Sequence, residues 1–78
     1  MLKEAVYEKI TEMCDNKENI IYEDYKVNKE INIEWYQVIV KTTYDSFRIY
    51  LGTLHSTGNI TVNYMSVHNE MLEAINNS

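Results

Sequence analysis

The sequence has no proline, only two glycines, a single cysteine and no apolar run of more than a few residues. With so little proline and glycine, no segment has the composition of a linker, which predicts a single domain over residues 1–78. The lone Cys14 cannot form an internal disulfide, as expected in a reducing compartment. The apolar runs are too short for a membrane span, and MLKEAVYEKITEM lacks the unbroken apolar stretch of a signal peptide. We therefore expect a cytoplasmic protein.

Basic residues are also in the minority. Seven lysines and arginines stand against twelve acidic residues, for a formal net charge of −5. A field of this sign repels phosphate backbones, so nucleic acid is a disfavoured partner. The chain is 45% hydrophobic, which is typical of an ordered globular protein and not of a disordered segment.

Both ends of the chain have helical spacing. In residues 2–15 the apolar side chains recur every three or four positions, which predicts a helix that ends near Asp15 or Asn16. Its stripe consists of Leu2, Val6, Ile10 and Met13. A second helix is predicted at the C-terminus, with Ser66 as its N-cap and a stripe of Val67, Met71, Ala74 and Ile75.

Between the helices the pattern is that of strands. Residues 20–27 are rich in Ile, Tyr and Val, although two acidic residues blur the alternation, so we expect an edge strand. In residues 31–43 the apolar positions change from odd to even at Trp35 and Tyr36. A β-bulge there would place all of them on the core face. The alternative is a strand that is buried on both faces near its centre.

The last two strands alternate clearly. Phe47, Ile49 and Leu51 are expected to face the core, with Arg48, Tyr50 and Gly52 on the opposite face. In residues 59–65 the inward positions are Ile60, Val62 and Tyr64. The fold class is therefore α+β: a two-layer sandwich in which a four-stranded antiparallel meander is covered on one face by an N-terminal and a C-terminal helix, in the order αββββα.

The segment LGTLHSTGNITV contains residue types that active sites favour. His55 has only Ser56 beside it, however, and Gly58 suits a hairpin loop, so a turn is the better interpretation. Cys14 is expected to be a small buried hydrophobe. The chain has no glycine-rich phosphate loop and no metal-ligand spacing among its His, Cys and Glu residues. We expect no catalysis, no cofactor and no metal.

The exposed face of the predicted sheet is the first candidate contact surface. If the connection at residues 44–45 sets the register, Ile39 lies opposite Tyr50 and Lys41 opposite Arg48, with Met65 alongside. The predicted patch consists of Ile39, Lys41, Arg48, Tyr50, Leu54 and Met65. Contiguous exposed apolar area of this kind often marks a binding site for a protein. Ordinary cross-strand packing is the alternative.

The second candidate surface is an acidic stripe on the first helix, formed by Glu4, Glu8, Glu12 and Asp15. A solvated helix face is the simplest explanation of such a stripe. The sharper hypothesis is that the carboxylates imitate the phosphates of a nucleic-acid strand and occupy the basic groove of a nucleic-acid-processing protein. In length, acidity and its content of Asn, Ile and Tyr, the chain is similar to small acidic inhibitors from bacteriophages that act in this way.

The sequence GTLH at residues 52–55, within an order of helix, strands and helix, also resembles the β-hairpin loop of the double-stranded-RNA-binding domain. The resemblance implies RNA binding through lysines that open the last helix. That position here reads SVHNEML, without a lysine. We therefore keep this topology only as an alternative, with the open sheet face as the nucleic-acid-binding surface.

The last strand, Asn59 to Met65, has neither charge nor proline, so at a sheet edge it would favour pairing with a second copy. Together these features predict a small acidic protein-binding module, without catalysis, that acts on a protein partner. A homodimeric structural protein is a further alternative.

Overall fold

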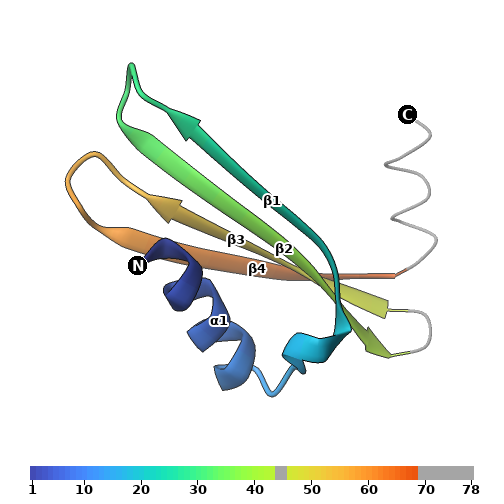
Figure 1. Ribbon diagram of the computed structural model, residues 1–78. Helices are drawn as coiled ribbons and strands as arrows, with labels where there is room; N and C mark the ends of the chain where they lie inside the picture. Colours follow the sequence, from blue (N-terminus) through green and yellow to red (C-terminus); the bar gives the residue numbers. More distant parts are fainter. Residues whose placement is uncertain (44–45, 69–78) are drawn as a thin grey trace, which may run out of the picture.

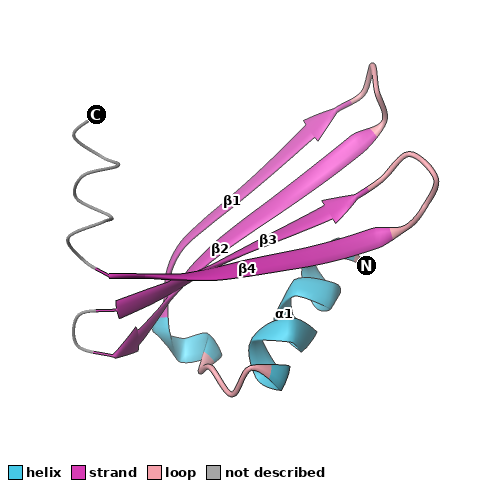
Figure 2. Ribbon diagram, turned by 180° about the vertical axis from the view of Figure 1, so that it is seen from behind, coloured by secondary structure: helices cyan, strands magenta, loops and turns pink. Residues whose placement is uncertain are grey.

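The structure is a computed structural model that describes residues 1–43 and 46–68 (Figure 1). Helix α1 (Leu2–Glu12) and a short 3₁₀ helix η1 (Lys17–Asn19) precede four strands: β1 (Ile20–Asn28), β2 (Ile33–Thr43), β3 (Ser46–Leu54) and β4 (Ile60–His68). The strands form one antiparallel sheet in the order β1-β2-β3-β4, so the predicted meander is confirmed and β1 and β4 are its edges. Helix α1 lies on one side of this sheet (Figure 2).

The stripe predicted for the first helix is confirmed. Leu2, Val6 and Ile10 are buried against the sheet and Met13 packs partly buried beside them. The helix ends at Glu12, earlier than predicted. Two hydrogen bonds close its last turn, from the Cys14 amide to the Thr11 carbonyl and from the Asp15 amide to the Ile10 carbonyl, each 3.0 Å long. This is a Schellman cap, in which Cys14 adopts the left-handed φ of 63° that glycine usually supplies.

The core lies between α1 and the middle of the sheet. Tyr36, Val38 and Val40 of β2 and Tyr50 of β3 are buried there. Helix α1 packs closely against the sheet at Gly52. A Cβ atom on Gly52 would overlap Val6 Cγ2 and lie 3.0 Å from Leu2 Cδ1. A glycine is needed at this position because the helix packs directly onto the backbone of β3.

The predicted two-helix cover of the sheet is wrong. Among residues 1–43 and 46–68, α1 is the only α-helix that packs on the sheet, and no C-terminal helix is present. Ser66 and Val67, assigned above to the start of that helix, belong to β4, which pairs with β3 as far as Ser46 opposite His68. The ladder satisfies the backbone groups of this segment, so it overrides a weak helical spacing. The rest of the predicted helix lies outside the described residues.

The bulge predicted at Trp35 and Tyr36 is also wrong. The register of β2 against β3 runs unbroken from Glu34 opposite Leu54 to Lys41 opposite Phe47. Trp35 and Tyr36 therefore point to opposite faces. The alternative of a strand buried on both faces does not hold either, because Tyr36, Val38 and Val40 are buried toward α1 whereas Trp35 and Ile39 are partly exposed on the other face. The irregularities lie elsewhere, between Ile20 and Tyr22 in β1 and between Lys41 and Thr43 in β2.

The irregularity in β2 reverses the predicted faces of β3. Next to the turn, Thr43 pairs with Ser46. If this register continued along both strands without a bulge, Ile39 would lie opposite Tyr50, as predicted from the sequence. Thr42 is an extra residue, so Ile39 instead pairs with Ile49. A shift of one residue turns every side chain of a strand to the other face. Arg48, Tyr50 and Gly52 therefore face α1, whereas Phe47, Ile49 and Leu51 face away from it.

Candidate functional site: the open face of the sheet

The sheet face opposite α1 carries a large set of apolar side chains. We call it the open face. Its apolar members come from all four strands and are Tyr22, Ile33, Trp35, Ile39, Phe47, Ile49, Leu51, Met65 and Val67. None of them belongs to the cluster that packs against α1. Tyr22, Leu51 and Met65 are 49%, 39% and 54% exposed, whereas Val67 is buried at one end of the face. An antiparallel sheet covered on one side normally presents polar residues on the other.

The middle of the open face is formed by neighbouring apolar pairs. Ile39 lies opposite Ile49 on β2 and β3, and Ile49 lies opposite Met65 on β3 and β4. A shallow depression of about 260 Å³ opens here and is lined by Gln37, Ile49, Leu51, Asn63, Tyr64 and Met65. A concave, mostly apolar site with a few amide groups is suited to receiving side chains of a partner.

The open face has little charge. Its charged side chains in the described strands are Asp24, Lys26 and Lys41, that is, two positive charges and one negative, or +1. The whole chain carries −5. Lys26 lies opposite Trp35, and Lys41 lies opposite Phe47 near the other end of β2. The acidic surface of the protein is therefore elsewhere, and the open face is nearly neutral.

The structure divides the patch predicted from the sequence. Ile39, Lys41 and Met65 do lie on the open face. Arg48, Tyr50 and Leu54 lie on the face covered by α1, where Tyr50 is fully buried and Leu54 packs against the core. Trp35, Phe47, Ile49 and Leu51 also lie on the open face and were missed, because the sequence assigned them to the core. The signal that could have found Trp35 was the apolar pattern on both faces of residues 33–40.

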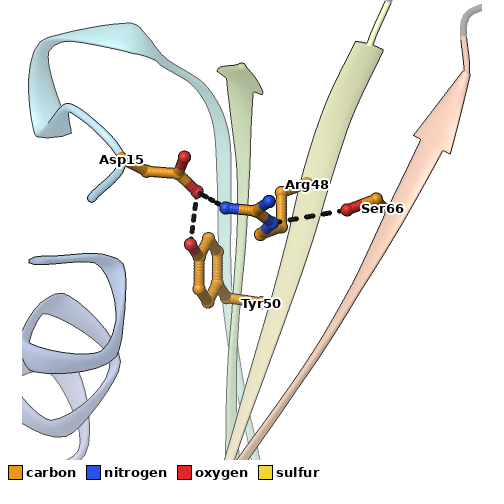
Figure 3. A network of polar contacts seen from close by, with 4 residues as sticks. All are labelled: Asp15, Arg48, Tyr50 and Ser66. Atoms are coloured by element: carbon orange, nitrogen blue, oxygen red, sulfur yellow. Dashed lines mark hydrogen bonds and ion pairs between the residues drawn. The ribbon is translucent and has the colours of Figure 1, made fainter. Parts of the chain in front are cut away.

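Arg48 and Tyr50 instead form a polar network with the loop that follows α1 (Figure 3). Arg48 Nη1 donates to Asp15 Oδ2 at 2.7 Å, and the Tyr50 hydroxyl donates to the same oxygen. Arg48 Nε donates to Ser66 Oγ at 3.4 Å on β4. Burial, followed by the hydrogen bond to Asp15, raises the pKa of Tyr50 to about 12. The network fixes the end of α1 to the sheet, so Arg48 is not available to a partner.

The acidic stripe on α1 is shorter than predicted. Glu4, Glu8 and Glu12 are exposed, but the Asp15 side chain is only 10% exposed because it is paired with Arg48. The N-terminal amino group pairs with Glu4, and this hydrogen bond lowers the pKa of Glu4. Lys9 Nζ lies 3.4 Å from Glu12 Oε1. Two of the three exposed carboxylates of the stripe, those of Glu4 and Glu12, are therefore already paired with a positively charged group.

A second polar cluster joins α1, β1 and β2. The hydroxyl groups of Tyr36 and Tyr7 donate to Glu23 Oε1 at 2.6 and 2.8 Å. These two hydrogen bonds lower the pKa of Glu23, whereas burial, together with the bond to Glu23, raises the pKa of Tyr36 well above its usual range. The groups satisfy one another, which is the arrangement of a structural cluster at the border of the core.

The loop between β3 and β4 is a turn, as predicted. The His55 amide donates to the Asn59 carbonyl at 2.8 Å and the Gly58 amide donates to the His55 carbonyl at 2.9 Å, with Gly58 at a φ of 93°. His55 Nε2 lies 3.0 Å from Thr61 Oγ1. Cys14, predicted to be buried, is exposed. Within residues 1–43 and 46–68, no three His, Cys, Asp or Glu side chains are grouped to hold a metal ion.

The sequence matches no protein family, and comparisons with curated proteins and with solved structures give no match either. In the described part of the chain, no helix has the length and hydrophobicity needed to cross a membrane. A function for this chain therefore has to be inferred from the open face and from the charges around it.

Proposed function

We propose that this chain is a small non-catalytic protein-binding module whose open face receives the surface of another protein. The observation that carries the proposal is the exposure of Leu51 and Met65 beside Trp35 and Ile49, on a sheet face that α1 does not cover. An exposed apolar area of this extent on a small chain is typical of a contact surface.

The energetic gain from covering this face is substantial. Full burial of a Leu or Met side chain contributes about 1.5–3 kcal/mol. Leu51 and Met65 are 39% and 54% exposed, so covering the two together contributes roughly 1.5–3 kcal/mol. The partly exposed Trp35, Ile39, Phe47 and Ile49 add to this sum. Aromatic residues such as Trp35 are also enriched among the residues that dominate binding energy at interfaces.

The acidic helix supports a narrower second candidate, inhibition of a nucleic-acid-processing protein by phosphate mimicry. Glu4, Glu8 and Glu12 are exposed at intervals of four residues, about 6 Å apart along the helix axis. Because α1 covers the face opposite the open face (Figure 2), the two candidate surfaces can be changed independently. Single-stranded nucleic acid on the open face is a third candidate, supported by Lys26 opposite Trp35.

A capture experiment with three forms of the protein tests the proposal. The wild type, Leu51→Asp and the double variant Glu8→Lys, Glu12→Lys are immobilised, and nuclease-treated lysate is passed over each. A protein retained by the wild type and by the helix variant but lost with Leu51→Asp supports binding through the open face. Loss only with the helix variant supports phosphate mimicry instead.

The salt dependence of binding separates a protein from a nucleic acid on the open face. A complex with a phosphate backbone weakens steeply as salt is added, because bound counterions are released. An apolar protein contact does not. The wild type is therefore also exposed to lysate that has not been treated with nuclease. Retention of nucleic acid that disappears at raised salt, with no retained protein, would contradict the proposed function.

A further inference from the structure

We infer that the protein that covers the open face is a second copy of this chain, an inference that rests on the proposed function of that face as a protein-binding surface. Two copies would stack their sheets face to face, with a helix α1 on each outer side. Stacked sheets in proteins lie about 10 Å apart, with their side chains interdigitated. The open face would then become the centre of a β-sandwich.

The shape of the single chain is that of a sheet that lacks a second layer on its open face. Its extents are 38 × 31 × 16 Å, so the molecule is thin in one direction. A flat chain buries less apolar surface than a compact one, and a second sheet on the open face would correct this deficit.

The area of the open face approaches the lower end of standard protein interfaces. Strands β1, β3 and β4 have nine residues each, which is about 30 Å of extended chain, and four strands span about 19 Å. The face therefore measures roughly 570 Å² as a flat projection, before the relief of its side chains is counted. Standard interfaces bury about 800 Å² of accessible surface on each partner. Two open faces together present roughly 1,140 Å² by this projection, just below the range of about 1,200–2,000 Å² in total for standard interfaces.

The charges of the open face suit a second copy better than a phosphate-bearing partner. In the described strands its charged side chains are Asp24, Lys26 and Lys41, for a net charge of +1, so two such faces meet with little repulsion even though each chain carries −5. Around Ile39, Ile49 and Met65 apolar surface would meet apolar surface. A phosphate backbone would find only two lysines on this face.

The test uses Trp35, the single tryptophan of the chain, which lies on the open face. Sedimentation equilibrium gives the mass from about 1 to about 100 μM, which covers the weak end of interfaces of this size. Acrylamide quenching of Trp35 fluorescence is measured over the same range. We expect the mass to double as concentration rises and Trp35 to become shielded from acrylamide in parallel.

Two matched variants locate the interface. Met65→Asp places a charge on the open face, where Met65 is 54% exposed, and Val27→Asp places the same charge on the other face, where Val27 is 46% exposed. Burying an unpaired carboxylate at both ends of a symmetric contact should raise the dissociation constant of Met65→Asp by about 100-fold or more. Val27→Asp should dimerise as the wild type does. Far-UV circular dichroism checks that both variants are folded.

The other outcomes overturn the inference. A mass of one chain at every concentration excludes a second copy, and capture of a different protein that depends on Leu51 would then still support the proposed function. A doubled mass with Trp35 equally accessible to acrylamide would assign the contact to the β4 edge instead. If Met65→Asp fails to fold, the shielding of Trp35 in the wild type decides between face and edge.

Discussion

Replacing Asp15 by asparagine should destabilise the protein markedly, because Asp15 forms the least exposed ion pair among the described residues, although neither partner is fully buried. The Arg48 and Asp15 side chains are 20% and 10% exposed. Asparagine keeps the shape of the side chain but leaves the Arg48 guanidinium without its counter-charge. Removing one partner of a fully buried pair costs about 3–5 kcal/mol. With the residual exposure of Arg48, we expect about 2–3 kcal/mol, a large part of the roughly 4–12 kcal/mol available to a chain of this size.

Urea denaturation at one fixed protein concentration, followed by circular dichroism, measures this loss. Glu8→Gln is the control, since it removes a charge from exposed α1 surface and should change the free energy of unfolding by less than about 0.5 kcal/mol. A double-mutant cycle with Arg48→Met should give a coupling of about 1 kcal/mol or more between the two positions. A loss for Asp15→Asn no larger than that of Glu8→Gln would refute the role assigned to this network.

Three further results are expected. Gly52→Ala should lower the free energy of unfolding by about 1–3 kcal/mol in urea, since its methyl group would overlap Val6; an unchanged midpoint would contradict the close packing of α1. Cys14→Gly should raise the free energy of unfolding by about 1 kcal/mol, because glycine adopts the φ of 63° without strain. A lower free energy of unfolding would contradict the strain assigned to Cys14. Between about pH 10 and 12 tyrosines ionise in the unfolded chain, whereas Tyr36 and Tyr50 stay protonated in the folded protein because their pKa values are raised. Their contribution to stability is therefore complete below about pH 10 and should decrease as pH rises, by up to about 1.4 kcal/mol per pH unit for each of the two tyrosines. Tyr50→Phe should flatten this alkaline decline.

The features that could be predicted from the sequence depend on local signals. The spacing of Leu2, Val6 and Ile10 predicts which side of α1 is buried, because helical periodicity requires only neighbouring residues. Gly58 predicts the turn between β3 and β4, because a positive φ is needed there. The meander follows from short connections between successive strands.

The composition of the candidate site could not be predicted because it depends on a single extra residue. Thr42 shifts the pairing of β2 with β3, and nothing in the sequence near Thr42 indicates a bulge. Without that shift Tyr50 would lie on the open face and Ile49 in the core. Both strands carry apolar residues at odd and at even positions, so hydrophobicity alone does not select the register. Half of the predicted patch was therefore placed on the wrong side.

The position of Asp15 could not be predicted for a different reason. Its spacing from Glu12 suggests a continuous acidic stripe only if the helix continues to Asp15. The Schellman cap ends α1 at Glu12 and brings Asp15 to Arg48, which is distant in sequence. A helix cap without glycine gives no clear stop signal in the sequence, since cysteine residues rarely adopt a positive φ.

The open face and the β4 edge are competing sites for self-association, and their expected contributions differ. No residue from Ile60 to Val67 is charged, so the edge is poorly protected. Pairing through it would form about nine hydrogen bonds at a net 1 kcal/mol or so each. Stacking two open faces removes roughly 1,100 Å² from water, and with about 60% of it apolar this contributes roughly 17 kcal/mol. Both routes lose similar rotational and translational freedom. The face therefore provides the stronger driving force, and β4 remains free for a further contact once the faces are covered.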